Sequence, residues 1–234
     1  MSTQATPDAS QEERLNRARA ALKDVETRIG TTREAWERPA LPLAVDLAPL
    51  LTEGLRRGQV VVVDGATSLM LALAAEASRE GSWTAAIGMP SVGVVAAARR
   101  GIELSRLALI PHPGAQAADA VGACVDGMDV VLLGPSLVLS DADRRRIASR
   151  ARERGSVVIT AGDWPAAHVR LAVERQAWSG LGAGDGRLRE RELTVAVAGR
   201  QSGSVRRVRV LLDADPGVRW TRPGARIDVD EEVA

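Results

Sequence analysis

The chain has 234 residues with 31 basic and 30 acidic side chains, so its net charge of +1 gives no sign of the basic footprint of a nucleic-acid-binding protein. A single cysteine, Cys124, excludes an internal disulfide and any metal site built from several cysteines. The apolar runs are too short to span a bilayer, and the polar start MSTQATPDASQEERLN is no signal peptide. These features predict a cytoplasmic protein.

Residues 1–40 are expected to form a polar tail followed by an amphipathic helix. Ser10 and Glu13 match a capping box, the pattern that begins many helices. Gly30 is a natural stop. Between them one apolar stripe repeats at helical spacing, and its large members form the predicted docking face: Leu15, Leu22, Val25 and Ile29. The sequence leaves open whether this helix packs on its own domain or docks onto another protomer or a partner.

Residues 41–213 are predicted to form one α/β domain. Five short apolar strands, each separated from the next by a helical segment, are expected at 59–63, 83–87, 106–110, 129–133 and 156–160. This alternation predicts a mainly parallel sheet with helices on both faces. From Val169 the chain alternates polar and apolar residues, which predicts antiparallel strands that extend the sheet. Residues 214–234 are expected to be a flexible tail.

The segment from Leu41 to Leu212 resembles the RecA-like recombinase core. GLRRGQVVVVDG is similar to its lead-in and first strand, GMDVVLLGP to its Walker B strand, and VRRVRVLL to one of its C-terminal antiparallel strands. More narrowly, VVVDGATSLMLAL and AWSGLGAGDGRL resemble the actinobacterial ImuA-type accessory proteins of the damage-inducible mutasome. The resemblance implies an N-terminal helical arm, a degenerate RecA-like core and a role in the SOS response and DNA repair.

The resemblance implies that this protein binds an ImuB-type Y-family polymerase relative. Through that partner it would act with an error-prone C-family DNA polymerase in translesion synthesis and mutagenesis. The resemblance also implies association with the nucleoid during DNA damage and self-association through the N-terminal arm. The two loops that hold single-stranded DNA in the recombinase family are short here, GPSLVLS and AGDWPAAH, so contact with DNA is expected to be weak or indirect. Two alternatives stay open. One is a SulA-like regulatory inhibitor of cell division, and the other is a residual nucleotide-binding or single-stranded-DNA-binding RecA paralogue.

The turn after the first strand retains only remnants of a phosphate loop, namely Gly65, Thr67 and Ser68. Such a loop needs a lysine, but the one lysine, Lys23, lies in the N-terminal helix, and no arginine lies between Gly58 and Ser78. We therefore expect that nothing near this turn can neutralise a triphosphate.

The two acidic residues that a RecA-like ATPase needs are also absent from this sequence. The Walker B strand ends in Gly134-Pro135 instead of an acid, and Met89-Pro90 follows the second strand in place of the catalytic glutamate. The sequence therefore predicts a pseudo-ATPase with no catalytic residue, no cofactor and no bound metal.

In a RecA-type strand order the third strand lies at the sheet edge, where free backbone groups can accept a strand from a partner. Leu107 and Leu109 are expected to border this docking site, which would receive the tail of an ImuB-type partner or this protein's own N-terminal arm. The apolar residues predicted to line its pockets are Val94, Ala98, Ala117 and Val121.

Other patterns are assigned structural roles. Trp164, beside Pro165, is interpreted as a packing or partner contact rather than a base-stacking residue. The glycine-rich stretch 180–186 is expected to connect a hairpin rather than bind a dinucleotide, because it opens no helix. The arginines between Arg144 and Arg154 are interpreted as a solvated helix face, with contact to DNA or an acidic partner as the alternative.

Overall fold

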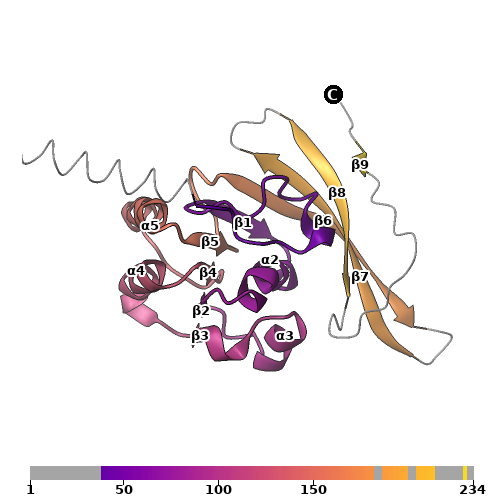
Figure 1. The fold of residues 1–234 in the computed structure, drawn as a ribbon, viewed down its shortest axis with the longest axis horizontal. Helices are drawn as coiled ribbons and strands as arrows, with labels where there is room; N and C mark the ends of the chain where they lie inside the picture. The colour runs from indigo at the N-terminus through magenta and orange to yellow at the C-terminus, as the bar shows by residue number, and fades with distance from the viewer. Residues whose placement is uncertain (1–37, 182–185, 200–203, 214–228, 231–234) are drawn as a thin grey trace, which may run out of the picture.

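The computed structural model describes residues 38–181, 186–199, 204–213 and 229–230 (Figure 1). The predicted N-terminal docking helix, with Leu15, Leu22, Val25 and Ile29, lies outside the described residues. The helices and strands are, in chain order, η1 (Val45–Leu47), β1 (Val60–Asp64), α2 (Thr67–Arg79), β2 (Thr84–Ile87), α3 (Val94–Arg99), η2 (Leu104–Arg106), β3 (Leu107–Ile110), η3 (Gly114–Gln116), α4 (Ala117–Gly127), β4 (Val130–Leu133), α5 (Asp141–Arg154), β5 (Val157–Thr160), β6 (Val169–Leu181), β7 (Gly186–Gly199), β8 (Val205–Asp213) and β9 (Val229–Asp230).

All nine described strands form one sheet in the order β3-β2-β4-β5-β1-β6-β7-β8-β9. Strands from β3 to β6 pair in parallel, and β6 to β9 pair antiparallel. The predicted fold class is therefore confirmed: a mainly parallel α/β sheet is extended by C-terminal antiparallel strands. β3 lies at one edge, as the RecA-type order implies.

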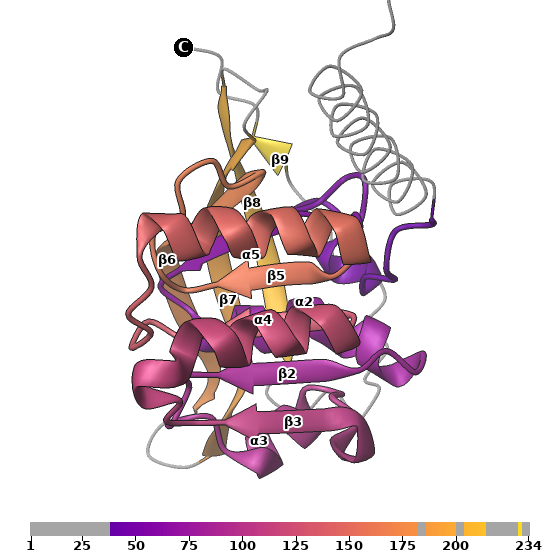
Figure 2. The ribbon, with the colours of Figure 1, turned by 90° about the vertical axis from the view of Figure 1, so that its left-hand side faces the viewer.

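Two apolar layers hold the sheet between its helices. α4 and α5 cover one face, while α2 and α3 lie on the other (Figures 1 and 2). Residues of β1, β2, β4 and β5 are buried on both faces, as expected for central parallel strands. On the α2 side the core continues under the antiparallel strands through Leu171, Leu193, Val195, Val208 and Val210.

Local signals place the ends of several elements. α5 begins at a capping box, in which the Ser140 hydroxyl accepts from the Asp143 backbone N–H and the Asp143 carboxylate accepts from the Ser140 backbone N–H. It ends at Gly155, whose φ of 76° is the left-handed conformation that glycine adopts without strain. The five predicted parallel strands all form, each beginning one residue later than expected.

The antiparallel part of the sheet is dominated by the hairpin of β6 and β7, which extends away from the parallel core (Figure 1). Its ladder is interrupted by register shifts between Val173 and Arg175 and between Ser179 and Leu181. Such bulges increase the local twist and bend the strand. Within the segment expected to be a flexible tail, Val229 and Asp230 pair with β8.

Candidate functional site

The turn between β1 and α2 is short and closely packed. Gly65 has a φ of 92°, and a Cβ added there would lie 3.3 Å from the Cβ of Val173 on β6. Ala66 is the N-cap of α2 and provides no side-chain hydrogen bond. Thr67 and Ser68 are the first two residues of the helix, so the three predicted remnants do come together at its N-terminus. β6 therefore occupies the space directly beside the glycine.

A basic residue reaches this helix end from a distant strand. Nη1 of Arg191, on β7, donates to Oγ of Ser68 at 2.6 Å. The same guanidinium bonds Oε1 of Gln176 and lies 5.2 Å from the ring centroid of Trp178. The expectation that nothing near this turn can neutralise a triphosphate was drawn from the stretch between Gly58 and Ser78 and from Lys23, and it did not consider this guanidinium. The reason is that Arg191 is separated from Ser68 by 123 residues and approaches only because the hairpin folds over α2.

Asp64, at the end of β1, is also paired. Its carboxylate lies 3.5 Å from Nη1 of Arg170, which donates through Nη2 to Asp163 at 2.9 Å. The guanidinium of Arg170 therefore lies between two carboxylates, those of Asp64 and Asp163, at the carboxyl end of β1.

The carboxyl ends of β2 and β4 are closed by backbone packing. A Cβ added at Gly134 would lie 1.9 Å from the carbonyl oxygen of Gly88, so the structure has no room for a side chain there. Ser136 donates to the same carbonyl at 2.7 Å, and Leu137 packs against Gly88. Met89 is buried, with 6% of its surface exposed.

Asp129 lies at the other end of β4. Its carboxylate accepts from the Trp83 backbone N–H and from Arg57, each at 3.1 Å. These contacts connect the amino ends of β2 and β4 and serve the fold. No cluster of His, Cys, Asp or Glu able to hold a metal occurs among the described residues.

Among the described strands, β3 ends the sheet on one side with no neighbour beyond it, and this edge carries an apolar surface. Leu107 packs on the α2 side of the core, so Leu109, two residues later, faces the same side. α3 lies beside β3 on that side (Figure 2). We define the β3 edge patch as the four large apolar residues exposed there: Val94 (46%), Val95 (65%), Leu104 (42%) and Leu109 (40%).

The six residues predicted to bind a partner divide into two groups. Val94, Ala98 and Leu109 are exposed and Leu107 is half-buried, all at or near the free edge. Ala117 and Val121 belong to α4, and their side chains are buried in the core, so neither contributes to the surface. Both lie on the side of α4 that packs against the sheet.

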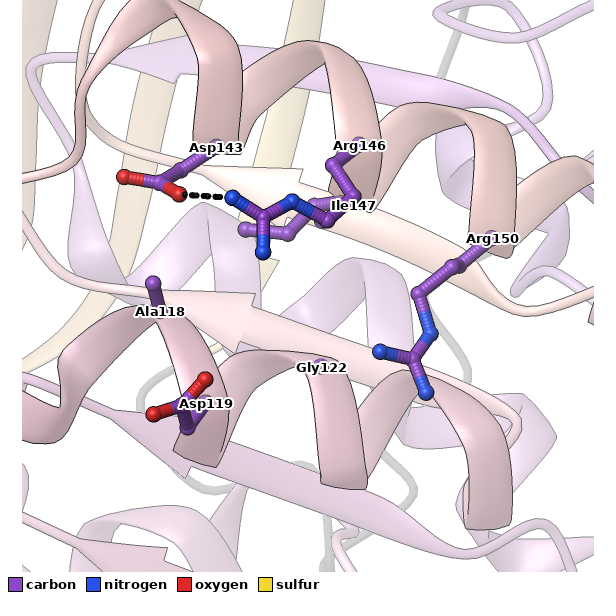
Figure 3. A pocket seen from close by; sticks show the side chains of 7 residues that line it. All are labelled: Ala118, Asp119, Gly122, Asp143, Arg146, Ile147 and Arg150. Carbon is purple, nitrogen blue, oxygen red and sulfur yellow. Dashed lines mark hydrogen bonds and ion pairs between the residues drawn. The ribbon is translucent and has the colours of Figure 1, made fainter.

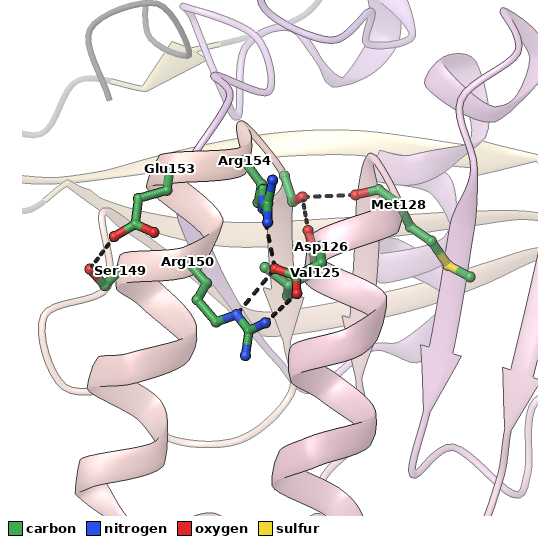
Figure 4. Close-up of polar contacts among 8 residues, drawn as sticks. Val125, Asp126, Met128, Ser149, Arg150, Glu153 and Arg154 are labelled. Atoms are coloured by element: carbon green, nitrogen blue, oxygen red, sulfur yellow. Dashed lines mark hydrogen bonds and ion pairs between the residues drawn. The ribbon is translucent and has the colours of Figure 1, made fainter. Parts of the chain in front are cut away.

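The α5 arginines are largely ion-paired. Arg150 forms two bonds to Asp126 of α4, and Arg154 approaches the same carboxylate (Figure 4). The Arg150 hydrogen bond holds the pKa of Asp126 below its ordinary value. Arg146 pairs with Asp143 beside a pocket of about 20 Å³ between α4 and α5 (Figure 3). This volume suits about one water molecule, so the pocket does not suit an organic ligand.

The remaining predicted features have structural positions. Trp164 is 3% exposed and packs in the α5-side core, which confirms its assignment to packing. Residues 180–186 connect β6 to β7, with Leu181 paired to Gly186, so the hairpin interpretation is confirmed. Nδ1 of His168 accepts from the Val60 backbone N–H at 3.0 Å. Cys124 is buried, which raises the pKa of its thiol.

Comparison with known proteins identifies the family. A model described as the MT3502 N-terminal domain matches residues 49–166, half of the chain. The chain belongs to the MT3502 N-terminal domain family. The match runs from the segment before β1 to the loop after β5, and so covers the parallel strands up to β5 with their helices.

One curated relative of this MT3502-family chain is an uncharacterized protein, Rv3395c, of Mycobacterium tuberculosis. The two are 39% identical over 129 residues, which is 54% of this chain and 63% of the relative. Among solved structures, the KaiC-like protein PH0186 of Pyrococcus horikoshii OT3 is similar at a TM-score of 0.45 and 12% identity, over 75% of this chain and 99% of that chain. The part of the chain that the structure describes has no helix long and apolar enough to cross a membrane.

Proposed function

We propose that this protein is a non-catalytic RecA-like adaptor of the damage-inducible mutasome. Its proposed partner is an ImuB-type Y-family polymerase relative, and through it an error-prone C-family DNA polymerase, so that the protein supports translesion synthesis without hydrolysing ATP. The motif resemblance of the chain supports this role. The observation that carries it is the free, partly apolar edge at β3.

The backbone at this edge can accept a short strand. The Gly88 N–H donates to the Ile110 carbonyl at 2.9 Å, so Ile110 faces β2. Because successive residues of a strand point their backbone groups to opposite sides, those of Leu109 face outward. The Leu107 N–H is bonded to Leu104, and Pro111 has no N–H. An added strand therefore finds few backbone bonds, and the β3 edge patch would supply much of the affinity.

The nucleotide region supports a non-catalytic role. In a working phosphate loop, backbone N–H groups and a lysine surround the anion at the helix N-terminus. Here Val173 packs against Gly65, and Arg191 is already engaged by Ser68, Gln176 and Trp178. Gly134 has no room for the side chain of a magnesium-binding acid.

Calorimetric titration of the full-length protein with a full-length ImuB-type partner tests the proposal. Leu109→Lys or Val95→Glu should weaken binding at least about tenfold, because a charge would be buried in an apolar contact. Val45→Glu is the matched control. Val45 is 82% exposed in η1, which packs against β8, near the other end of the sheet. No binding by the wild type, or equal affinity for all variants, would count against the adaptor role.

A second candidate, a residual nucleotide binder, is favoured by one observation: Arg191 supplies a positive charge beside Ser68 at the N-terminus of α2. Trp178 lies against the same guanidinium and can report on ligand binding. If ATP with magnesium quenches tryptophan fluorescence at micromolar concentration, and Arg191→Ala abolishes the effect, this candidate gains support. No change at millimolar ATP removes it.

A further inference from the structure

One side of the antiparallel strands β6, β7 and β8 is not covered by a helix in the part of the chain that the structure describes. Leu193, Val195 and Val208 pack on the α2 side, and we call the opposite side of these strands the outer face. The core beneath α4 and α5 includes residues of β1 but no described residue of β6, β7 or β8. Figure 1 shows β7 and β8 well away from α4 and α5. The outer face is therefore open to a partner.

The strand register places two arginines in one row across the outer face. Arg175 of β6 lies opposite Thr194 of β7, and Thr194 lies opposite Arg209 of β8. Thr194 alternates with the buried Leu193 and Val195, so the row belongs to the outer face. Neighbouring strands are about 4.8 Å apart, which puts the Cα atoms of the two arginines about 10 Å apart, on either side of the threonine.

Neither guanidinium of this row is neutralised. Both side chains are exposed, and neither has an ion pair or a side-chain hydrogen bond with a residue that the structure describes. The other two arginines of the outer face differ, because Arg207 donates to Glu174 and Arg170 lies between Asp64 and Asp163. A guanidinium presents its donors in a planar fork that fits an oxyanion. The row can therefore bind one anionic group, with the threonine hydroxyl as a further donor.

Acidic side chains beside the row favour a single anionic group over a polyanion. Glu192 is exposed and lies two residues from Thr194 along β7, a distance of about 6.8 Å in an antiparallel strand. Glu174 is exposed next to Arg175 on β6. Every nucleotide of a nucleic-acid strand carries a phosphate, so a strand laid along β7 would bring phosphates over Glu192. A protein segment can instead carry one carboxylate between neutral neighbours.

Apolar side chains flank the arginines on β8. Val205, Arg207, Arg209 and Leu211 alternate with the buried residues of this strand and so share the outer face. Val205 is 52% exposed and Leu211 is 38% exposed. Ala177 of β6 lies in the same row as Leu211, with Glu192 between them. The pattern of a cation with apolar neighbours is complementary to a segment in which aliphatic residues flank an acid.

We propose that the outer face is a second protein-binding surface, which takes a partner segment with an aspartate or glutamate flanked by aliphatic residues. The carboxylate binds between Arg175 and Arg209 beside Thr194, and the aliphatic side chains pack on Leu211. This surface lies toward the opposite end of the sheet from β3, so one chain can hold two protein segments at once. The proposal goes beyond the adaptor role at β3 and does not depend on what binds there.

Phage display of random peptides against the full-length protein tests this assignment. The wild type should select peptides in which aliphatic residues flank one acid, and Arg175→Gln/Arg209→Gln should lose this class. A synthetic peptide of the most frequent selected sequence should bind the double variant at least about tenfold more weakly, and Leu211→Ser about threefold more weakly. Arg145→Gln, at an exposed arginine of α5, is the matched control and should bind like the wild type. The absence of any class that depends on the two arginines, or its loss in Arg145→Gln as well, overturns the proposal.

A labelled oligothymidylate distinguishes a protein partner from a nucleic acid. It should bind more weakly than the selected peptide at about 0.15 M salt, and the double arginine variant should not change its affinity. Tighter binding than the peptide, abolished in the double variant, would make the outer face a nucleic-acid surface and refute the protein assignment. The double variant should keep the urea midpoint of the wild type, because both arginines are exposed and unpaired. A lower midpoint would show that these arginines stabilise the fold and would speak against a free binding surface, while Leu211→Ser still tests the contact.

Discussion

Gly134→Ala is expected to destabilise the fold strongly, because the carboxyl end of β4 has no space for a methyl group. The added Cβ would lie 1.9 Å from the Gly88 oxygen and 2.7 Å from Cγ of Met89, whereas ordinary contacts begin near 3.4 Å. The loop after β2 would have to move by roughly 1.5 Å, since a core packed to this density cannot absorb the overlap otherwise.

The size of the effect follows from what that movement breaks. Gly88 accepts from the Ser136 hydroxyl at 2.7 Å and donates to the Ile110 carbonyl at 2.9 Å. Each hydrogen bond contributes about 1 kcal/mol, and overpacking costs about 1–3 kcal/mol. The free energy of unfolding should therefore fall by about 3–5 kcal/mol. For a chain of this size, Tm should fall by roughly 6–20 °C.

Urea unfolding followed by tryptophan fluorescence measures this change. Gly127→Ala, at the end of α4, is the matched control, because an added Cβ there meets nothing within 4 Å. It should be neutral, or stabilising by up to about 1 kcal/mol. If Gly134→Ala unfolds within about 0.5 kcal/mol of the wild type, the packing argument fails, and with it the reasoning that an acid has no room at this strand end.

Three further outcomes are expected. Ser156→Ala should lower the free energy of unfolding by about 1–2 kcal/mol, because the buried Ser156 hydroxyl lies 2.5 and 2.8 Å from two backbone carbonyls near the end of α4. Urea unfolding of this variant, with Ser179→Ala as the control, measures the loss of stability. Asp126→Asn should cost only about 0.5–1 kcal/mol at pH 7, since solvent screens its pair with Arg150. The folded-state pKa of Asp126 is lowered, so this stability is present above the unfolded pKa of about 4 and lost as the pH falls further; thermal melts of the variant and wild type should converge toward pH 3. Cys124 should react slowly with a thiol reagent at pH 8 until urea unfolds the chain, because it is buried and its thiol pKa is raised.

Much of the parallel core could be predicted because its signals are local. Four-residue apolar runs mark strands that are buried on both faces, and the Ser140 cap and Gly155 stop set the observed bounds of α5. The sequence does not show which side of a helix meets the sheet, and for this reason Ala117 and Val121 were expected at the docking site but lie in the core.

The approach of Arg191 to Ser68 is a different kind of case. It depends on the length, twist and bulges of a hairpin that begins more than a hundred residues after the turn. A partial signal does exist. Arg191 lies two residues before the buried Leu193 and so shares its face of β7. Alternation alone therefore directs this arginine toward α2, but the distance along the helix cannot be read from it.

The placement of β6 has a practical consequence for anyone who prepares this protein in pieces. The recognised family segment ends at residue 166, yet β6 forms the parallel neighbour of β1, and Leu171 and Leu193 seal one side of the interior. A fragment that ends at residue 166 would lack β6 and β7, and so would expose the unpaired backbone of β1 and the apolar core beside it. Expression designs that retain everything through residue 213 should give well-behaved material, whereas the shorter fragment should aggregate.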